Sequence, residues 1–476
     1  MLFQSQLYLV LLFVVVLASW GLAGHAALRL LLLLCASCLF YMSWEPWFIG
    51  LILASTLLDY FVALGLDRTP LTRPRLRKAL LGVSLLGNLG LLGYFKYTNF
   101  FLQSFGQAST ALGVPLEFET LSILLPVGIS FYTFQTLSYS IDVYRREIPA
   151  ERSLLKFSTY VTFFPQLVAG PIVRAVDFLP QLQRMPGLSV DDVSQGLFRI
   201  ARGLVKKVCI ADPLAVNLVD RAFSQPSLYS GPELMVALYA YSMQIYCDFS
   251  GYSDIAIGSA RLMGYRLPEN FDRPYAATTV AGFWRRWHIP LSGWLRAYVF
   301  LPLGGSRGGV WRAHRNTMIT LVLIGVWHGA TWNFVLYGFL HGLAISVNRM
   351  LNRAGKTPKH EHDQPFWSIA WKVALTFHFV VICRILVRSY TWDPAVAYVE
   401  AMLDGGLGLG RIGAPVWATL AVAYGIHWTP QRWLDLAKGR FVALPAWGQG
   451  LALAGLAALM AKIAETEVVP FIYFQF

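Results

Sequence analysis

The chain has 476 residues, of which 56% are hydrophobic and 14% charged, and its mean hydropathy is +0.51. Soluble globular proteins carry roughly 25% charged residues, so this composition excludes an ordinary soluble protein. Lys and Arg exceed Asp and Glu by 13. The cationic residues cluster between apolar runs, which is typical of membrane topology and argues against nucleic-acid binding.

Apolar runs recur along nearly the whole chain and predict an all-α, polytopic membrane protein with one membrane-embedded domain over residues 1–476. A β-barrel would instead show short alternating segments. Several runs are short or broken by Pro and Gly, which indicates re-entrant or half-buried elements. The expected membrane segments are 7–23, 27–44, 47–66, 79–102, 121–141, 154–172, 196–220, 232–262, 317–345, 367–390, 414–428 and 447–464.

Two polar connections lie between these runs. Asp67–Lys78 holds five basic residues and two prolines, so the positive-inside tendency places it in the cytoplasm. Arg349–Gln364 contains His360 and His362, and we interpret it as a solvated loop rather than a metal site.

Polar side chains also recur inside apolar surroundings. Residues 125–146 carry hydroxyls and Gln135 every few positions, in a stripe that either lines a channel or joins helices. Residues 163–174 contain two prolines and a glycine and are expected to form a re-entrant element. In residues 244–258, Asp248 and Asp254 need partners if they are buried. We expect pairing with arginines such as Arg261 or Arg266, with a proton relay as the alternative.

The segment Phe283–Gly305, FWRRWHIPLSGWLRAYVFLPLGG, combines arginines, tryptophans and His288. Its amphipathic pattern predicts an interfacial helix. One interpretation is that tryptophans lie at headgroup level and arginines reach lipid phosphates. The other is a basic vestibule for an anionic acyl donor, because the planar guanidinium binds two phosphate oxygens.

The segment Thr317–Ala344 predicts one membrane helix with His328 near its middle. An ionisable group at that depth is costly to insert and indicates function, although a hydrogen bond to a neighbouring helix would also explain it. Gly325 and Gly329 flank His328 and allow another backbone or a ligand to come close. Trp332 is expected on the same face as His328, and His341 on roughly the opposite face near the end of the span.

These stretches together resemble the membrane-bound O-acyltransferase family, in its bacterial branch typified by alginate O-acetyltransferase. Any one motif is weak, but the ordered set over residues 125–476 is specific. One departure is that Arg296 is followed by Ala297, where the branch usually has an acidic residue. The matching motifs are LPVGISFYTFQTLSYSIDVYR, FPQLVAGPIVR, DFSGYSDIAIG, NFDRPY, FWRRWHIPLSGWLRAYVFLPLGG, GVWHGATWNFVLYGFLHG and the final PFIYFQF.

The resemblance implies a helical chamber in the bacterial inner membrane, open to both sides, with re-entrant and interfacial helices. The two histidines of the family's motifs fall on His288 and His328, and the second is regarded as the main catalytic residue. Acetyl-CoA is the expected donor, with no metal. The residues expected to bind the donor are Arg285, Arg286, Trp287, Trp332 and Asn333.

The expected function is O-acetylation of a secreted polysaccharide of alginate or cellulose type. The branch commonly passes the acyl group to an exported partner acetyltransferase, periplasmic or membrane-anchored, beside the polysaccharide synthesis and export machinery and membrane lipid. Docking is expected near the PFIYFQF end. Two alternatives remain: D-alanyl transfer to teichoic acid by the same fold, and a small-molecule transporter, which would predict an inverted repeat.

Overall fold

The computed structural model describes residues 3–114, 116, 118–168, 170–184, 187, 189–353, 365–464 and 469–472. These residues form helices joined by turns and short loops, and no strand occurs among them. The predicted all-α class is therefore confirmed. His360 and His362 of the polar loop, and the last four residues of the PFIYFQF end, lie outside the described residues.

By its internal contacts the chain divides into two compact units, 1–196 with 256–268, and 197–255 with 269–476. The prediction of a single domain over residues 1–476 stays a prediction. Two helices contribute residues to both units, α10 (Val190–Leu204) and α13 (Gly231–Leu262).

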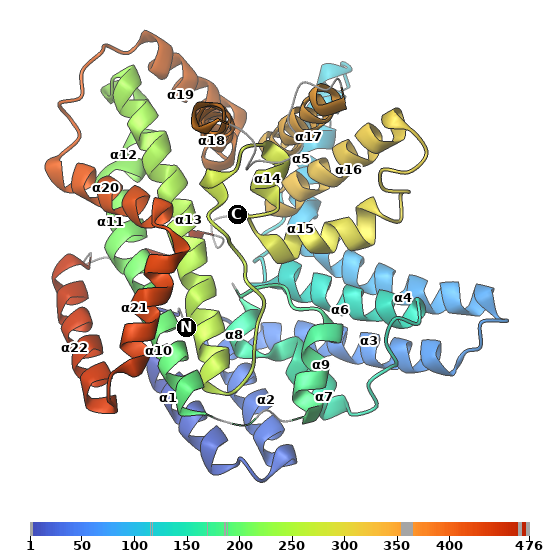
Figure 1. The fold of residues 1–476 in the computed structure, drawn as a ribbon. Helices are drawn as coiled ribbons and strands as arrows, with labels where there is room; N and C mark the ends of the chain where they lie inside the picture. The colour runs from blue at the N-terminus through green and yellow to red at the C-terminus, as the bar shows by residue number, and fades with distance from the viewer. Residues whose placement is uncertain are drawn as a thin grey trace. The chain divides into compact units, whose positions relative to one another are not determined.

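The first unit contains the N-terminal helices (Figure 1). Its elements are α1 (Gln6–Gly21), α2 (Ala26–Met42), η1 (Pro46–Phe48), α3 (Ile49–Arg68), α4 (Pro74–Leu92), η2 (Gly93–Tyr97), α5 (Thr98–Ala111), α6 (Ile129–Tyr144), α7 (Leu154–Thr162), α8 (Phe164–Leu167) and α9 (Ala175–Arg184).

A buried carboxylate joins α3, α4 and α6, which lie against one another. Asp59 of α3 accepts hydrogen bonds from Ser84 and Asn88 of α4 at 2.5 and 2.7 Å and from Ser140 of α6 at 2.7 Å. Buried polar groups need such partners. Gln135 of α6 likewise donates to the carbonyl of Tyr160 in α7. The polar stripe of residues 125–146 therefore joins helices at Ser140 and Gln135.

The second unit begins with a run of short helical segments, several of them π-helical, and continues to the C-terminus. Its elements are η3 (Val205–Ala211), α11 (Asp212–Leu214), η4 (Ala215–Val219), α12 (Asp220–Ser224), η5 (Pro226–Leu228), η6 (Pro274–Ala276), α14 (Val280–Trp284), α15 (Ile289–Leu295), η7 (Arg296–Phe300), α16 (Val310–His328), α17 (Trp332–Arg353), α18 (Phe366–Arg388), α19 (Trp392–Asp404), α20 (Ala414–Trp428), α21 (Gln431–Ala443) and α22 (Ala446–Ile463).

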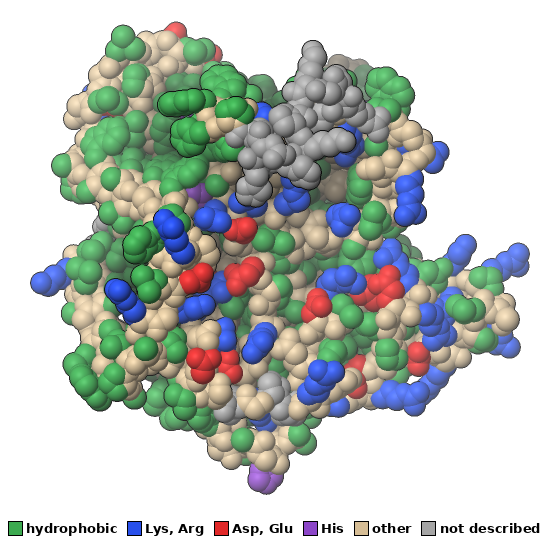
Figure 2. Space-filling view, in the orientation of Figure 1, with side chains coloured by type: hydrophobic (Ala, Val, Ile, Leu, Met, Phe, Trp, Pro, Cys, Tyr) green, Lys and Arg blue, Asp and Glu red, His purple; other side chains and the backbone are tan. Residues whose placement is uncertain are grey.

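Five helical stretches of the described residues are long and apolar enough to cross a membrane: Pro46–Arg68, Pro74–Ala111, Trp332–Leu351, Phe366–Arg388 and Ala446–Ile463. Helices α1 and α2 are apolar but shorter. Large apolar side chains lie exposed on the surface, and hydrophobic side chains are green in Figure 2. Exposed examples are Leu7, Val10 and Phe13 of α1 and Trp367 and Trp371 of α18. A bilayer would cover such helices.

The predicted single helix over Thr317–Ala344 is wrong, because the chain breaks between α16 and α17. The break at Gly329–Thr331 turns the chain back, and the two helices run side by side as a hairpin (Figure 1). His328 is therefore the last residue of α16. Trp332 begins the other helix and is 60% exposed. It therefore does not lie on the same helix face as His328, as the sequence had predicted.

Glycine allows the backbones of this hairpin to touch. A Cβ added at Gly325 would lie 2.1 Å from the carbonyl oxygen of Phe334, and one at Gly338 would lie 2.3 Å from that of Leu321. At Gly329, a Cβ would lie 2.1 Å from the Phe334 ring. The expectation that glycines beside His328 permit close approach is confirmed.

We predict that Gly325→Ala lowers the free energy of unfolding by about 1–3 kcal/mol, because the new methyl group overlaps a backbone atom that cannot rotate away. Thermal unfolding of the purified protein in detergent would measure this as a lower melting temperature. Gly90→Ala is the matched control, since Gly90 is also inside a helix but has nothing within 4 Å of an added Cβ. An unchanged melting temperature for Gly325→Ala would contradict the close packing of α16 on α17.

Candidate active site

His328 lies at the C-terminal end of α16 and is 9% exposed. Its Nδ1 is 2.7 Å from the carbonyl oxygen of Ile324, one turn earlier. A carbonyl oxygen only accepts hydrogen bonds, so Nδ1 carries the proton and Nε2 of the neutral ring carries the lone pair. The backbone thus fixes both the tautomer and the ring orientation, and leaves Nε2 as the basic atom.

His288 lies between α14 and α15, and its backbone is left-handed with φ 45°. Its Nδ1 is 2.9 Å from Oδ1 of Asn270. The Nδ2 of Asn270 donates to Oγ of Ser253, at 2.8 Å, and that hydroxyl donates to the carbonyl of Phe249. Because the Ser253 hydroxyl gives its proton to the Phe249 carbonyl, it accepts from Nδ2 of Asn270. The amide oxygen Oδ1 of Asn270 therefore faces His288 and accepts the hydrogen bond that Nδ1 of His288 donates.

Backbone hydrogen bonds reinforce this placement of His288. The N–H of Ile289 donates to the carbonyl of Asn270, and the N–H of Asp272 donates to that of Arg286. Pro290 is at the first turn of α15, where a missing N–H costs nothing. The strained backbone of a non-glycine residue persists only where its surroundings hold it.

The structure brings His288 and His328 together beside one indole ring. The ring of Trp327 lies 5.6 Å from that of His288 and 5.0 Å from that of His328. Burial, and then the electrostatic interaction with the neighbouring His328 imidazole, hold the pKa of His288 well below its usual range. The His288 imidazole is therefore neutral at physiological pH.

The remaining predicted site residues occupy different surroundings. Trp287 is 1% exposed, with the Arg384 guanidinium 4.5 Å from its ring centroid. Asn333 is buried and donates to the carbonyl of Thr391. Arg285 is exposed and Arg286 half-buried. The donor-binding role of these residues, and of the exposed Trp332, stays a prediction.

The predicted interfacial helix over Phe283–Gly305 is wrong. The segment forms α14, α15 and η7, with His288 in the interruption. Trp284, Trp287 and Trp294 are 5%, 1% and 7% exposed, so they pack in the interior instead of lying at headgroup level.

Residues 145–390 match the model of the membrane-bound O-acyltransferase family. The protein belongs to this family. It is 36% identical to the probable alginate O-acetylase AlgI of Pseudomonas putida over 100% of both chains. It is 36% identical to the peptidoglycan O-acetyltransferase of Helicobacter pylori, over 78% of this chain and 73% of that protein. A more distant match is the teichoic acid D-alanyltransferase of Streptococcus thermophilus, 30% identical over 58% of this chain and 71% of that protein.

The chain is accordingly an O-acyltransferase and a membrane protein, as the sequence motifs predicted, and both histidines lie inside the matched region. Family membership decides against the transporter alternative. Among the described residues of this acyltransferase, no three His, Cys, Asp or Glu side chains gather as metal ligands would.

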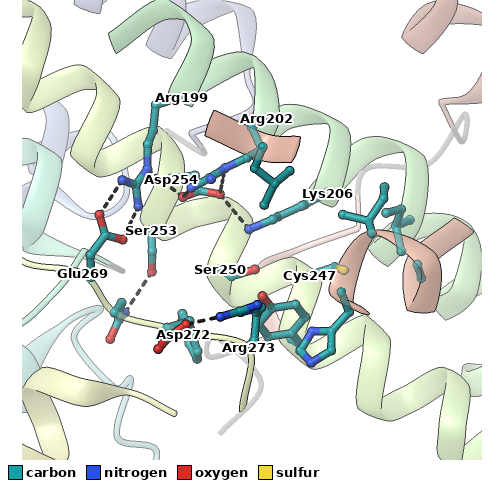
Figure 3. A pocket seen from close by; sticks show the side chains of 18 of the residues that line it. Arg199, Arg202, Lys206, Cys247, Ser250, Ser253, Asp254, Glu269, Asp272 and Arg273 are labelled. Atoms are coloured by element: carbon teal, nitrogen blue, oxygen red, sulfur yellow. Dashed lines mark hydrogen bonds and ion pairs between the residues drawn. The ribbon is translucent and has the colours of Figure 1, made fainter. Parts of the chain in front are cut away.

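The acyltransferase also has a polar cavity of about 100 Å³ that sequence reasoning missed. Figure 3 shows Arg199, Arg202 and Lys206 of one helical stretch directed at Asp254 of α13. Their nitrogens lie 2.8, 2.5 and 2.7 Å from its carboxylate, and Arg199 also pairs with Glu269. Pairing of the carboxylate is confirmed, but the partners differ from the expected Arg261 and Arg266.

The spacing of these three basic residues in the sequence could have predicted that they act together. Arg199, Arg202 and Lys206 are separated by three and four positions, which places them on one helix face. The cavity borders the active site through Asn270, which lines it and holds His288.

Residues 469–472, the described part of the C-terminal segment, belong to the same unit as His288 and approach it through the ring of Phe249. The N–H of Ile472 donates to Asp248, and Lys207 donates to the carbonyl of Val469. Lys207 also forms ion pairs with Asp212 and Asp248, at 2.7 and 2.8 Å. The ring of Phe471 packs on Phe249 at 5.7 Å, and Phe249 lies 4.9 Å from His288.

We predict that Asn270→Asp raises the pKa of His288, because a carboxylate beside Nδ1 stabilises the charged imidazolium. A rate that requires neutral His288 then falls at low pH, with its acid-side half-maximum moved to higher pH. A pH–rate profile of the purified acyltransferase would measure this shift. Asn99→Asp, at a half-buried asparagine of α5, should leave the profile unchanged. An unmoved acid limb in Asn270→Asp would show that the rate does not depend on the His288–Asn270 pair.

Proposed function

We propose that this acyltransferase moves an acetyl group from acetyl-CoA, on the cytoplasmic side of a bacterial inner membrane, for O-acetylation of a secreted polysaccharide. The observation that carries the proposal is the buried His328, whose Nδ1 is held by a carbonyl and whose Nε2 is the basic atom. The names of the similar proteins from Pseudomonas and Helicobacter favour acetyl as the acyl group and a cell-envelope polysaccharide as its destination.

In the proposed mechanism, Nε2 of His328 takes the proton of an acceptor hydroxyl. The alkoxide oxygen attacks the carbonyl carbon of the thioester, and the carbonyl electron pair moves to oxygen. When the tetrahedral intermediate collapses, the C–S bond breaks and the thiolate of CoA receives the proton from His328. A positioned base of this kind contributes roughly 10²- to 10⁴-fold to the rate.

His288 has a supporting role in this proposal, positioning the donor or assisting His328. It is neutral and fixed by Asn270, and its ring and that of His328 both lie beside Trp327. The mechanistic alternative is transient acylation of Nε2 of His328, with the acceptor arriving in a second half-reaction.

D-alanyl transfer remains the second candidate, because a teichoic acid D-alanyltransferase matches part of the chain. The alginate and peptidoglycan acetylases match a larger share of it. Alginate is thus favoured over cellulose, which none of these relatives' names mentions. Supplying the purified protein with acetyl-CoA or with a D-alanyl carrier thioester separates the two donors.

We predict that His328→Gln reduces acetyl transfer by at least about 100-fold, because the amide keeps the shape of the side chain but cannot accept a proton as a base. His288→Gln should reduce it less. The measurement is release of free CoA thiol from acetyl-CoA by each purified variant, with the hydroxyl-bearing acceptor present. His378→Ala is the control, since Nδ1 of His378 makes the same contact with a carbonyl one turn earlier, at 2.7 Å, on the exposed side of α18. Wild-type turnover by His328→Gln would refute the assignment of the base.

We further propose that an exported partner with a hydroxyl nucleophile receives the acetyl group and passes it to the polymer. A hydrated polymer cannot readily enter an apolar chamber, because each unpaired hydroxyl costs about 1–3 kcal/mol. A single protein hydroxyl at the mouth of the chamber avoids that cost. Phe471 and Ile472 of the C-terminal segment are 0% and 2% exposed, so the docking surface that we propose is formed by apolar loop residues instead.

Reconstitution tests the relay. Vesicles that contain only this protein, with acetyl-CoA on the cytoplasmic side and alginate on the other, should yield no acetylated polymer until the partner is added. The control is CoA release in the same vesicles once the partner is added, which shows that the enzyme is active when an acceptor hydroxyl is present. Efficient acetylation of the polymer without a partner would establish direct transfer to sugar.

A further inference from the structure

We infer that His341 of α17 is a third functional histidine, which donates a hydrogen bond from Nε2 to the carbonyl oxygen of the acyl donor as negative charge develops there. The inference rests on the proposed acetyl transfer. The sequence predicted a structural or interfacial histidine near the end of a span. The structure instead places His341 fully inside the protein, with 0% exposure.

The tautomer of His341 follows from its contact with Trp284. The indole Nε1 of Trp284 lies 3.1 Å from Nδ1 of His341. An indole N–H can only donate, so Nδ1 of His341 must be the acceptor. The proton of the neutral imidazole is therefore on Nε2. This arrangement is the reverse of His328 and His288, in which Nδ1 carries the proton and Nε2 is the basic atom.

The N–H of His341 is buried, and it meets no hydrogen-bond partner among the described residues. Its surroundings are aromatic: the rings of Tyr337 and Phe379 lie 4.4 and 5.1 Å away, and that of Phe283 lies 6.3 Å away. Buried donors in folded proteins are nearly always satisfied, so such a group requires an explanation. A substrate oxygen that arrives during the reaction would supply the missing acceptor.

The position of His341 relates it to the proposed base. His328 and His341 lie around the same two rings: Trp284 is 6.4 Å from His328 and 5.5 Å from His341, and Tyr337 is 6.4 and 4.4 Å from them. A base and an N–H donor thus lie around one aromatic group, as acyl transfer requires of a base and an oxyanion donor.

The chemistry assigns opposite tasks to the two rings. Nε2 of His328 removes the proton of the acceptor hydroxyl while the new C–O bond forms. The electron pair of the thioester carbonyl moves to its oxygen, and Nε2–H of His341 donates to that oxygen without transferring its proton. When the carbonyl re-forms, the C–S bond breaks, and the leaving thiolate is protonated by His328. His341 ends the cycle unchanged.

Two conservative substitutions separate this role from a packing role. His341→Gln places an amide N–H near the position of Nε2, and His341→Asn places an amide oxygen near that of Nδ1, where it can accept from Trp284. Each purified full-length variant, with His341→Ala and wild type, is assayed in proteoliposomes by release of CoA thiol from acetyl-CoA, with the hydroxyl-bearing partner present as the acceptor. Both kcat and KM for acetyl-CoA are determined, and thermal unfolding compares the folding of the variants.

We expect His341→Asn and His341→Ala to lose about 100- to 1,000-fold in kcat, the usual effect of removing one oxyanion donor. Their KM should change little, and His341→Gln should stay within about tenfold of wild type. Recovery of kcat by His341→Asn, or equal losses in the Asn and Gln variants, would overturn the inference while the acetyl transfer of the wild type stands. If the wild type releases no CoA thiol, the proposed function fails and the inference fails with it.

Discussion

The close approach of α16 and α17 is the constraint on which the described site depends. Gly325 and Gly338 let each helix touch the backbone of the other. With side chains at these positions the helices would separate, and His328 of one helix would no longer lie beside Tyr337 of the other. Because a helix pair packed through backbone atoms can shift little, the hairpin holds the imidazole more rigidly than a contact between flexible side chains would.

Polar pairing within the interior forms the second level of organisation. Three histidines of one unit each have a fixed tautomer, through a carbonyl for His328, an amide oxygen for His288 and an indole N–H for His341. An interior of low dielectric constant strengthens such contacts and penalises any group left without one. The same reasoning explains why Asp254 gathers three cations.

A small number of residues connect the helix hairpin with these polar contacts. Asn270 lines the polar cavity and holds His288, and Trp284 donates to His341 and lies 6.4 Å from the ring of His328. Trp287, expected at the membrane surface, supports this region from within under the guanidinium of Arg384. Trp284 and Trp287, two tryptophans of the same motif, thus make different contacts.

The sequence by itself determined the helical membrane class, the O-acyltransferase family and the two histidines of its motifs, because composition and ordered motifs are local properties of the chain. It also indicated that glycines beside His328 permit close packing. Only the tertiary structure decided that Thr317–Ala344 is a hairpin, since three residues, Gly329–Thr331, reverse the chain within an uninterrupted apolar run. It likewise decided the burial of His341 and the partners of Asp254. Those depend on which side chains meet across helices, and helical periodicity carries no information about contacts between segments that are far apart in the chain.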